Sequence, residues 1–333
     1  MIRRASQTFS RFFATEVSGG VFLLGACTIA LFFANSPLAS DYENFWNPSR
    51  NFISEALMSI FFFLVGLEIK REFDQGELRK PKAAALPIIA AIGGMILPAC
   101  IFALLNYSGN GSNGWAVAMP TDIALSLGAL ALLGSRIDHS LKMFLLTLAI
   151  ADDLGSIIVL GLFYSGGISP LRIASTIGAV LLAWILPFGK IVSTDRLISL
   201  IHPWTSFLII PLFALVNIGV RFDFHNLGKL VLSPVSLGLI IGRVVGKIAG
   251  ITFFAWLAIK IGVAQKPASL SYKEIAGAGA LAGMGLTVSL FIAELAFSDL
   301  LLLDQVRTGL ILAAVISATI GFLYLKKVSV SQD

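Results

Sequence analysis

The chain has 333 residues, of which 57% are hydrophobic and only 13% are charged, and its formal net charge at pH 7 is +5. A soluble domain carries about 25% charged residues, so this composition excludes a series of soluble domains. No run of like charges is long enough to make a nucleic-acid-binding arm. We therefore predict an all-α polytopic membrane protein, in which residues 1–333 form a single transmembrane domain in a lipid bilayer.

Apolar stretches of about 20 residues, the length that crosses a bilayer as a helix, recur along the chain. Residues 2–13, a segment whose only charges are basic, precede the first of these stretches. They predict an amphipathic interfacial helix instead of a cleaved signal peptide. The ten predicted spans lie near residues 14–35, 51–69, 83–106, 115–134, 143–164, 173–189, 204–220, 233–259, 274–297 and 308–325.

The loops between these spans are short, so the distribution of Lys and Arg predicts the orientation of the chain. Of the 24 Lys and Arg residues, Arg243 and Lys247 lie inside a predicted span, and five lie on the side opposite to the termini. The remaining 17 lie on the side of the two termini. Both termini are therefore predicted to be cytoplasmic.

Two predicted spans contain residues that interrupt a helix. The span 115–134 contains Met119-Pro120-Thr121-Asp122, and the span 274–297 is rich in glycine up to Thr287. Non-helical backbone at membrane depth is tolerated only where protein or a water-filled cavity satisfies it. Each is the middle span of a triplet, and the two triplets begin in opposite directions, as in the inverted repeats of transporters. Kinked packing helices are the alternative interpretation.

Most of the 19 acids lie in loops or near the ends of predicted spans, but Asp122, Asp152 and Asp153 do not, and Lys247 also lies in the middle of a span. A charge at the bilayer centre costs about 2.5–3.5 kcal/mol on insertion scales, so such residues belong in a pathway or in ion pairs. We predict a cation or proton pathway. A structural ion pair between Lys247 and one aspartate is the alternative.

The adjacent pair Asp152-Asp153 is the most informative feature of the sequence. Neighbouring side chains on a helix point about 100° apart, so one can face a water-filled funnel while the other faces a helix. Two carboxylates this close do not ionise independently, which suits the exchange of protons for a cation. Carboxylate oxygens are ligands for a small hard cation, and no His or Cys cluster indicates a transition metal.

Charged residues also gather at the ends of the second predicted span. Glu55 begins the span, and Glu68 and Glu72 end it beside Arg71. The acids at the end of the span indicate first a solvated ion-pair cluster and second a regulatory site. His202, near the start of a later span, is a candidate pH sensor.

Several stretches of the sequence resemble those of a known protein family. They are Gly66-Leu67-Glu68-Ile69-Lys70-Arg71-Glu72, Thr121-Asp122-Ile123-Ala124, Ala149-Ile150-Ala151-Asp152-Asp153-Leu154-Gly155, His202-Pro203-Trp204, Val245-Gly246-Lys247 and Gly283-Met284-Gly285-Leu286-Thr287-Val288-Ser289. Through them the chain resembles, over nearly its whole length, the NhaA-type sodium/proton antiporters of bacterial inner membranes.

This resemblance implies that Asp153 is the principal cation-binding carboxylate and that Asp152 is its partner, which can pair with Lys247. Asp122 and Thr121 match the point where two unwound spans of the family cross. At that point Asp122 is expected to offset the positive N-terminal ends of the half-helices, and Lys247 the negative C-terminal ends.

The resemblance further implies a cytoplasmic cluster that responds to pH. Glu68, Arg71 and Glu72 match this cluster, and Glu55 matches an acid near the start of the same span. Together with His202, the candidate pH sensor, these residues are assigned to the pH response. The Glu-His pair that the family carries before its His-Pro-Trp stretch is replaced here by residues 198–199, which are Ile and Ser. Part of this cluster is therefore absent.

Members of the family usually have twelve spans, two more than we predict, and residues 155–202 are too few for the sixth and seventh. The ion-binding panel is predicted to comprise residues 83–164 and 233–325, and the interface panel residues 1–82 and 165–232. In the family, the sixth and seventh spans belong to the interface panel. The loop 37–50, where the family can form a β-hairpin that pairs two subunits, is also short, which weakens the expectation of a homodimer.

The sequence thus predicts electrogenic exchange of Na⁺ or Li⁺ for H⁺, in which cation and protons compete for Asp152 and Asp153. Neither enzymatic activity nor a cofactor is expected. The main alternative is a shortened relative that has lost transport and acts as a membrane binding or scaffold protein. A channel and an intramembrane aspartyl protease are further alternatives, although such a protease needs its aspartates on separate helices.

Overall fold

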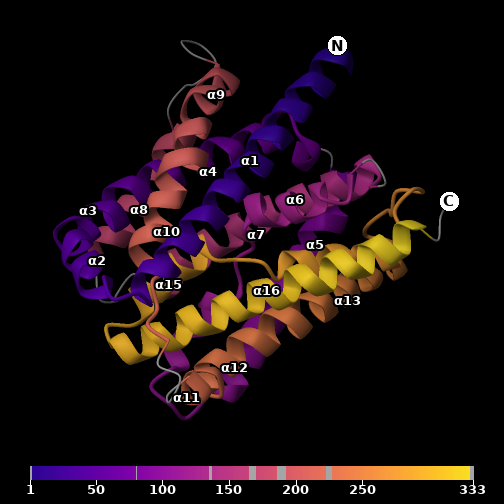
Figure 1. Cartoon of the computed structure of the whole chain (residues 1–333). Coiled ribbons are helices and arrows are strands. Elements are labelled where there is room, and N and C mark those ends of the chain that lie inside the picture. Colours follow the sequence, from indigo (N-terminus) through magenta and orange to yellow (C-terminus); the bar gives the residue numbers. More distant parts are fainter. Residues whose placement is uncertain are drawn as a thin grey trace.

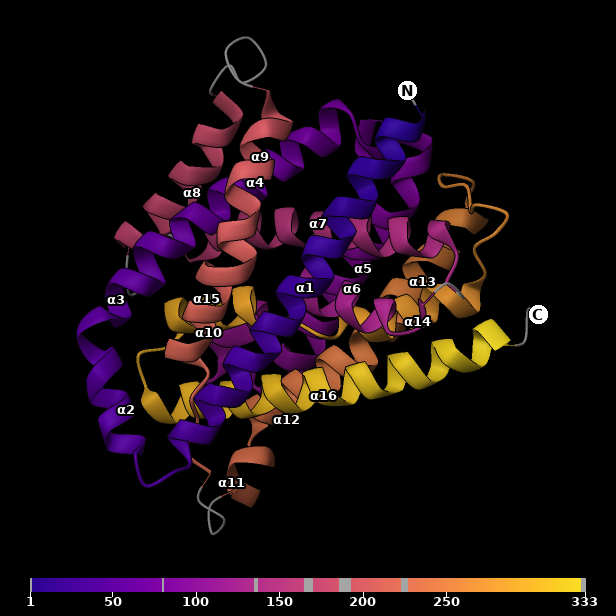
Figure 2. The same cartoon turned by 45° about the horizontal axis from the view of Figure 1, so that its top comes forward.

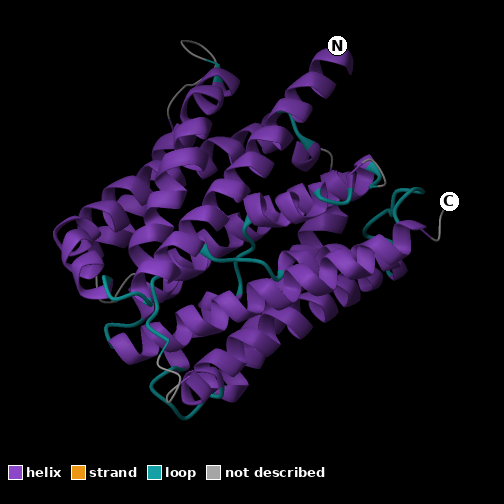
Figure 3. Cartoon of the chain, viewed as in Figure 1, coloured by secondary structure: helices purple, strands orange, loops and turns teal. Residues whose placement is uncertain are grey.

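The computed structural model describes residues 2–79, 81–134, 137–164, 170–185, 193–222 and 227–330. All regular structure among these residues is helical (Figure 3). The α-helices are α1 (Ile2–Ala34), α2 (Ala39–Trp46), α3 (Arg50–Phe52), α4 (Met58–Asp74), α5 (Pro81–Leu105), α6 (Ile123–Ala131), α7 (His139–Phe163), α8 (Pro170–Ile185), α9 (Thr194–Trp204), α10 (Ile210–Asn217), α11 (Leu227–Val231), α12 (Pro234–Ile241), α13 (Lys247–Lys260), α14 (Tyr272–Ala282), α15 (Thr287–Ala296) and α16 (Leu300–Val330).

Shorter helical turns join several of these elements. Three 3₁₀ helices are η1 (Asn47–Ser49), η3 (Glu77–Arg79) and η4 (Ser112–Ala118). Three π-helical turns are η2 (Ile53–Leu57), η6 (Thr205–Ile209) and η7 (Gly242–Gly246). Each π turn lies within a longer helical run, which it interrupts locally without ending the helix.

Seven continuous segments of the described chain are long and apolar enough to cross a membrane. They are Thr15–Ala34, Ala39–Asp74, Pro81–Leu105, His139–Phe163, Thr194–Asn217, Pro234–Lys260 and Leu300–Val328. Two further spans are bent helix pairs: η4 with α6, at 41°, and α14 with α15, at 51°. These pairs fall in the two spans predicted to be interrupted, so that prediction is confirmed.

The described residues hold up to nine of the ten predicted spans. The remaining predicted span, 173–189, begins in α8, whose described apolar part is Ala174–Ile185. The rest of this predicted span lies outside the described residues. So do Lys80, Arg136 and Lys190, which were used to predict the orientation.

The N-terminal part of the chain differs from the prediction in two places. The interfacial helix predicted over residues 2–13 is continuous with the first span in α1, because neither Pro nor Gly occurs before Gly19 to interrupt it. In the loop 37–50, helix α2 occupies the place where the family can form a β-hairpin.

The helices form two groups that lie side by side (Figures 1 and 2). In one group α4 packs against α8 and α9, and α1 packs against α10. In the other group α5 packs against α7 and α13, and α16 packs against α12 and α14. Helix α6 contacts α1 as well as α7, so the first bent pair lies between the groups.

Glycine allows the closest helix contact, between α5 and α13. A Cβ atom on Gly250 would lie 2.2 Å from the carbonyl oxygen of Gly93, and a Cβ on Gly93 would lie 2.4 Å from the carbonyl oxygen of Gly250. Small residues of this kind let helix backbones approach each other in membranes, where packing drives association. The contact places the start of α13, with Lys247, against the middle of α5.

We predict that Gly250→Ala destabilises the protein by about 1–3 kcal/mol, because the added methyl group overpacks a backbone contact. The unfolding temperature of the purified protein in detergent is the measurement. Gly178→Ala in α8 is the control, because its Cβ would meet no atom within 4 Å. Equal unfolding temperatures for the two variants would contradict this account of the contact.

Candidate functional site

The two bent pairs cross at their breaks, in the middle of the bundle, where loop segments separate the half-helices (Figure 3). One backbone hydrogen bond joins the breaks directly: the amide of Asp122 donates to the carbonyl oxygen of Met284 over 2.8 Å. We call the pair η4–α6 span 4 and the pair α14–α15 span 9, from their order among the predicted spans. The two broken spans hold each other through this bond, in the way that interrupted backbone at membrane depth requires.

Four carbonyl oxygens, those of residues 281–284, lie at the end of α14 and in the break that follows it. Each has a donor group from outside α14 within 3.1 Å, which meets the requirement that buried backbone groups be paired. In the order of the carbonyls, the donors are Ser126 Oγ at 3.0 Å, Thr121 Oγ1 at 3.0 Å, Arg243 Nε at 3.1 Å and the Asp122 amide at 2.8 Å.

Asp122 lies at the N-termini of both second half-helices. It is the N-cap of α6, where its Oδ1 accepts from the amide of Leu125 at 3.4 Å. Its Oδ2 accepts from the hydroxyl of Thr287, the first residue of α15, at 3.0 Å. A carboxylate in this place offsets the positive ends of two helix dipoles.

Asp152 and Lys247 form an ion pair that is fully buried. The Nζ atom of Lys247 lies 2.6 Å from Asp152 Oδ2, and both side chains are 0% exposed. Thr121 completes a triad: its hydroxyl lies 2.6 Å from the same Oδ2 atom and 3.0 Å from Lys247 Nζ. The polar side chain of the break in span 4 thus contacts both members of the pair.

Asp153, the neighbour of Asp152 on α7, faces a different space. It lines a small cavity together with Thr121, Asp122 and Thr287. The volume that the centres of water molecules can occupy in this cavity is about 40 Å³. In the same measure, a single water molecule needs about 10–15 Å³. Asp153 Oδ1 has no hydrogen-bond partner among the described residues, although the side chain is buried. Asp152 Oδ1 also has no partner among the described residues, but Asp152 is paired with Lys247 through Oδ2 and does not line the cavity. Asp153 is therefore the aspartate of the pair whose free oxygen belongs to a residue of the cavity.

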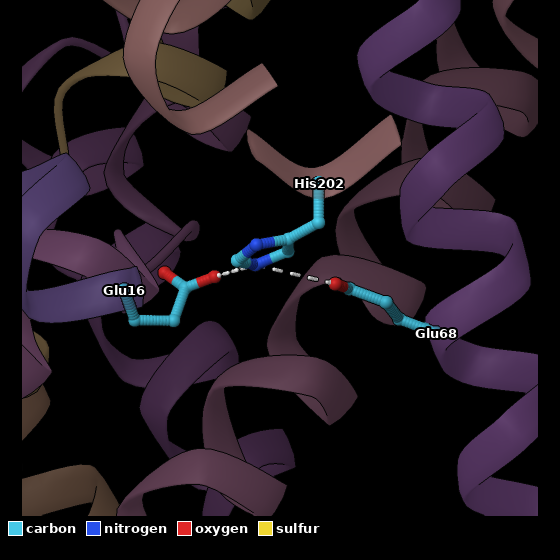
Figure 4. A group of neighbouring side chains, drawn as sticks. All are labelled: Glu16, Glu68 and His202. Atoms are coloured by element: carbon cyan, nitrogen blue, oxygen red, sulfur yellow. Dashed lines mark hydrogen bonds and ion pairs between the residues drawn. The ribbon is translucent and has the colours of Figure 1, made fainter. Parts of the chain in front are cut away.

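Three further buried ionisable residues line the same cavity: Glu16 from α1, Glu68 from α4 and His202 from α9 (Figure 4). His202 Nε2 lies 2.5 Å from Glu16 Oε1 and 3.8 Å from Glu68 Oε1. The cavity therefore connects two clusters of ionisable groups: this one, and the site around Asp153.

The comparisons with known proteins agree with one another. The family model described as Na⁺/H⁺ antiporter 1 matches residues 10–194 and 172–325. The chain belongs to this Na⁺/H⁺ antiporter family. Among its relatives are proteins named Na(+)/H(+) antiporter NhaA from Shewanella sp. (strain ANA-3) and from Aeromonas salmonicida (strain A449), each 36% identical to this chain.

The alignments also show that this chain is shorter than these family members. The alignment with the Shewanella relative covers 95% of this chain and 97% of the relative, and that with the Aeromonas relative covers 96% of each. These alignments extend over 378 and 381 residues, although the chain has only 333. The two pieces matched by the family model overlap at residues 172–194, inside the region 155–202 where we expected two spans to be missing.

The remaining predicted site residues of this antiporter lie away from the crossing. Glu72 is buried, and its carboxylate lies against Gly76, where a Cβ would come within 2.1 Å of Oε2. Arg71 is half-buried beside it at the end of α4. Glu55 is half-buried in the π turn η2. It is 13 residues from Glu68, or about 20 Å at 1.5 Å per residue, so it belongs to the opposite end of this span.

Sequence reasoning missed two residues of the antiporter site. Glu16, near the start of the predicted span 14–35, was not singled out, and only the packing of α1 against α10 and α6 places it beside His202. Arg243 was assigned to a span but was given no role. The rule that selected Lys247, that a charge inside a span is costly, applies equally to Arg243.

We predict that breaking the buried pair destabilises the antiporter more than removing both of its charges. Lys247→Met and Asp152→Asn each leave one buried partner without its counter-charge, at a cost of about 3–5 kcal/mol. The double variant leaves neither charge unpaired, so its unfolding temperature in detergent is expected to lie above that of either single variant.

Glu43→Gln provides the control, since it removes an exposed pair with Arg221 that is worth about 0–1 kcal/mol. Additive losses in the double variant would show that Asp152 and Lys247 do not act as a pair.

Proposed function

We propose that this protein exchanges Na⁺ for protons across the membrane, with Asp153 as the carboxylate that binds either ion. The observation that carries the proposal is the buried, unpartnered Oδ1 of Asp153 in a cavity beside two broken helices. Asp152 is held by Lys247, so the pair offers one carboxylate to a ligand and one to a fixed counter-charge.

The donor atoms around Asp153 suit a small hard cation. Thr121, Asp122 and Thr287, whose side chains carry hydroxyl or carboxylate oxygens, line the same cavity. Hard cations are bound by carboxylate, hydroxyl and carbonyl oxygens and by water. Li⁺ has the same preference as Na⁺, so we include it as a substrate. Dehydration of such an ion is costly, so water molecules are expected to complete its coordination shell.

Exchange follows from competition between the cation and protons for the carboxylates of Asp152 and Asp153. For both aspartates to take part, Asp152 exchanges its contact with Lys247 for a proton during the cycle. A cation then displaces protons from Asp152 and Asp153 on one side of the membrane, and protons displace the cation on the other side. Two titrating carboxylates give more than one proton per cation, hence electrogenic exchange. The panel of residues 83–164 and 233–325 is proposed to move against residues 1–82 and 165–232, which alternates access to the site.

We place the protein in the inner membrane of a bacterium, with both termini in the cytoplasm. Lys and Arg are concentrated on the side of the termini, as the positive-inside rule requires. The relatives quoted above are bacterial proteins. The lipid bilayer, Na⁺, Li⁺ and H⁺ are therefore the proposed partners of the chain.

We further propose that the cluster of Glu16, Glu68 and His202 controls how exchange depends on pH. The cluster lines the same cavity as Asp153 and lies in the protein interior, where charges are little screened. Arg71 and Glu72, at the end of the same helix as Glu68, are assigned to this pH response. Glu55 is retained with them on the basis of the family resemblance alone.

Asp153→Asn is predicted to abolish Na⁺-dependent proton movement, because an amide neither releases a proton nor balances the charge of a cation. Recovery of quenched acridine orange fluorescence in everted vesicles measures the exchange. Glu43→Gln, an exposed acid, is expected to leave it unchanged. Full exchange in Asp153→Asn would overturn the assignment. An inactive wild-type protein would favour the scaffold alternative.

Glu16→Gln is predicted to move the pH profile of exchange to lower pH without abolishing exchange. A buried negative charge attracts protons to nearby carboxylates, so its removal lets the site release protons in more acidic solution. The same vesicle assay, run between pH 6 and 9 at a fixed Na⁺ concentration, measures the shift. A profile that coincides with that of the wild type would exclude Glu16 from the pH response.

A further inference from the structure

Arg243 is a fully buried arginine in the π turn η7, between α12 and α13. Within the described part of the chain, all of its side-chain hydrogen bonds go to the two broken spans. Nε donates to the carbonyl of Gly283 at 3.1 Å, Nη1 to the carbonyl of Val117 at 2.9 Å, and Nη2 to the carbonyl of Pro120 at 2.5 Å. Nη1 also donates to the hydroxyl of Ser289 at 2.7 Å.

The three carbonyls belong to the C-terminal ends of the first half-helices. Val117 lies in η4, Pro120 lies in the break that follows η4, and Gly283 directly follows α14. Helix C-termini present unpaired carbonyls and a partial negative charge. Arg243 therefore places one guanidinium where the negative ends of two half-helices meet.

Lys247, four residues further on, has different partners. Its hydrogen bonds go to Asp152 and Thr121, not to the backbone of the breaks. An ammonium group is a compact charge, whereas the planar guanidinium carries five donors in fixed directions. Arg243 is thus the side chain whose shape matches several carbonyls at once.

The glycines of span 9 leave room for this guanidinium. A Cβ atom on Gly285 would lie 1.8 Å from Arg243 Nη2 and 2.5 Å from the carbonyl oxygen of Pro120. Gly285 has a negative φ, so the backbone conformation does not demand glycine. The close approach of Arg243 and Pro120 does.

We propose that Arg243 is the positioning residue of the crossing: it supplies the permanent positive charge that joins the two broken spans, and Lys247 is thereby left to pair with Asp152. The proposal rests on the exchange function proposed above and adds a second cation to the site. Arginine stays protonated in proteins, so this charge persists throughout the transport cycle.

The proposal has a consequence for ion binding. Arg243 interacts electrostatically with both Asp152 and Asp122. Removing its charge makes the carboxylates of the site hold protons more tightly, so exchange requires a higher pH. A unit charge acting in the protein interior shifts such a profile by about one pH unit.

The test compares Arg243→Met, Arg243→Lys and Ser289→Ala in everted vesicles, each with a pH profile and an apparent KM for Na⁺. Arg243→Met is expected to move the profile about one unit toward alkaline pH. Arg243→Lys keeps the charge and is expected to keep the wild-type profile, but with a raised apparent KM, since one ammonium cannot hold all three carbonyls. Ser289→Ala, which loses one hydrogen bond and no charge, is expected to keep the profile.

If Arg243→Met does not accumulate as a folded protein, Arg243→Gln replaces it, since it is neutral but retains two N–H donors. An unshifted profile in the neutral variant, or a shift in Arg243→Lys as large as in the neutral variant, would overturn the proposal. These outcomes differ from a failure of the exchange function, in which wild-type vesicles themselves show no Na⁺-dependent proton movement.

Discussion

The structure depends on one constraint: two helices are broken inside an apolar bundle, and the backbone groups freed by the breaks need partners where water is scarce. The chain meets this need by crossing the breaks. Carbonyls from residues 281–284 and from Val117 and Pro120 receive donors from the opposite span and from Arg243. The charged side chains of the site are therefore part of what makes the fold possible, and a change at the site is also a change in the backbone pairing.

The same contacts give the two aspartates of α7 different environments. Thr121 lies within hydrogen-bonding distance of Asp152, of Lys247 and of the end of α14, so the state of the ion pair and the geometry of the crossing are coupled. Asp153 is one residue further along the helix, turned by about 100°, and faces the cavity. A cation or proton bound at Asp153 would therefore act beside a pair that contacts Thr121, the residue that also bonds to the end of α14.

Much of this arrangement could be predicted from the sequence, because the cost of charge and of broken backbone in a membrane singles out a few residues. Asp122, Asp152, Asp153 and Lys247 were found in this way, as were both breaks. The partners of those residues could not be predicted. Glu16 meets His202 across 186 positions of the chain, and only helix packing brings them together.

The chain is shorter than its relatives, and its two broken spans nevertheless cross and share a hydrogen bond. The family model is matched in two pieces that overlap at residues 172–194, around α8. This helix packs on α4, where Gly66 faces Val180 and Ala183, and Lys70 donates to the carbonyls of Ala183 and Trp184. None of these residues lines the cavity at Asp153. If the shortening falls at this place, as the sequence predicts, it removes helices next to α4 and α8. The half-helices, Arg243 and the aspartate pair keep their partners.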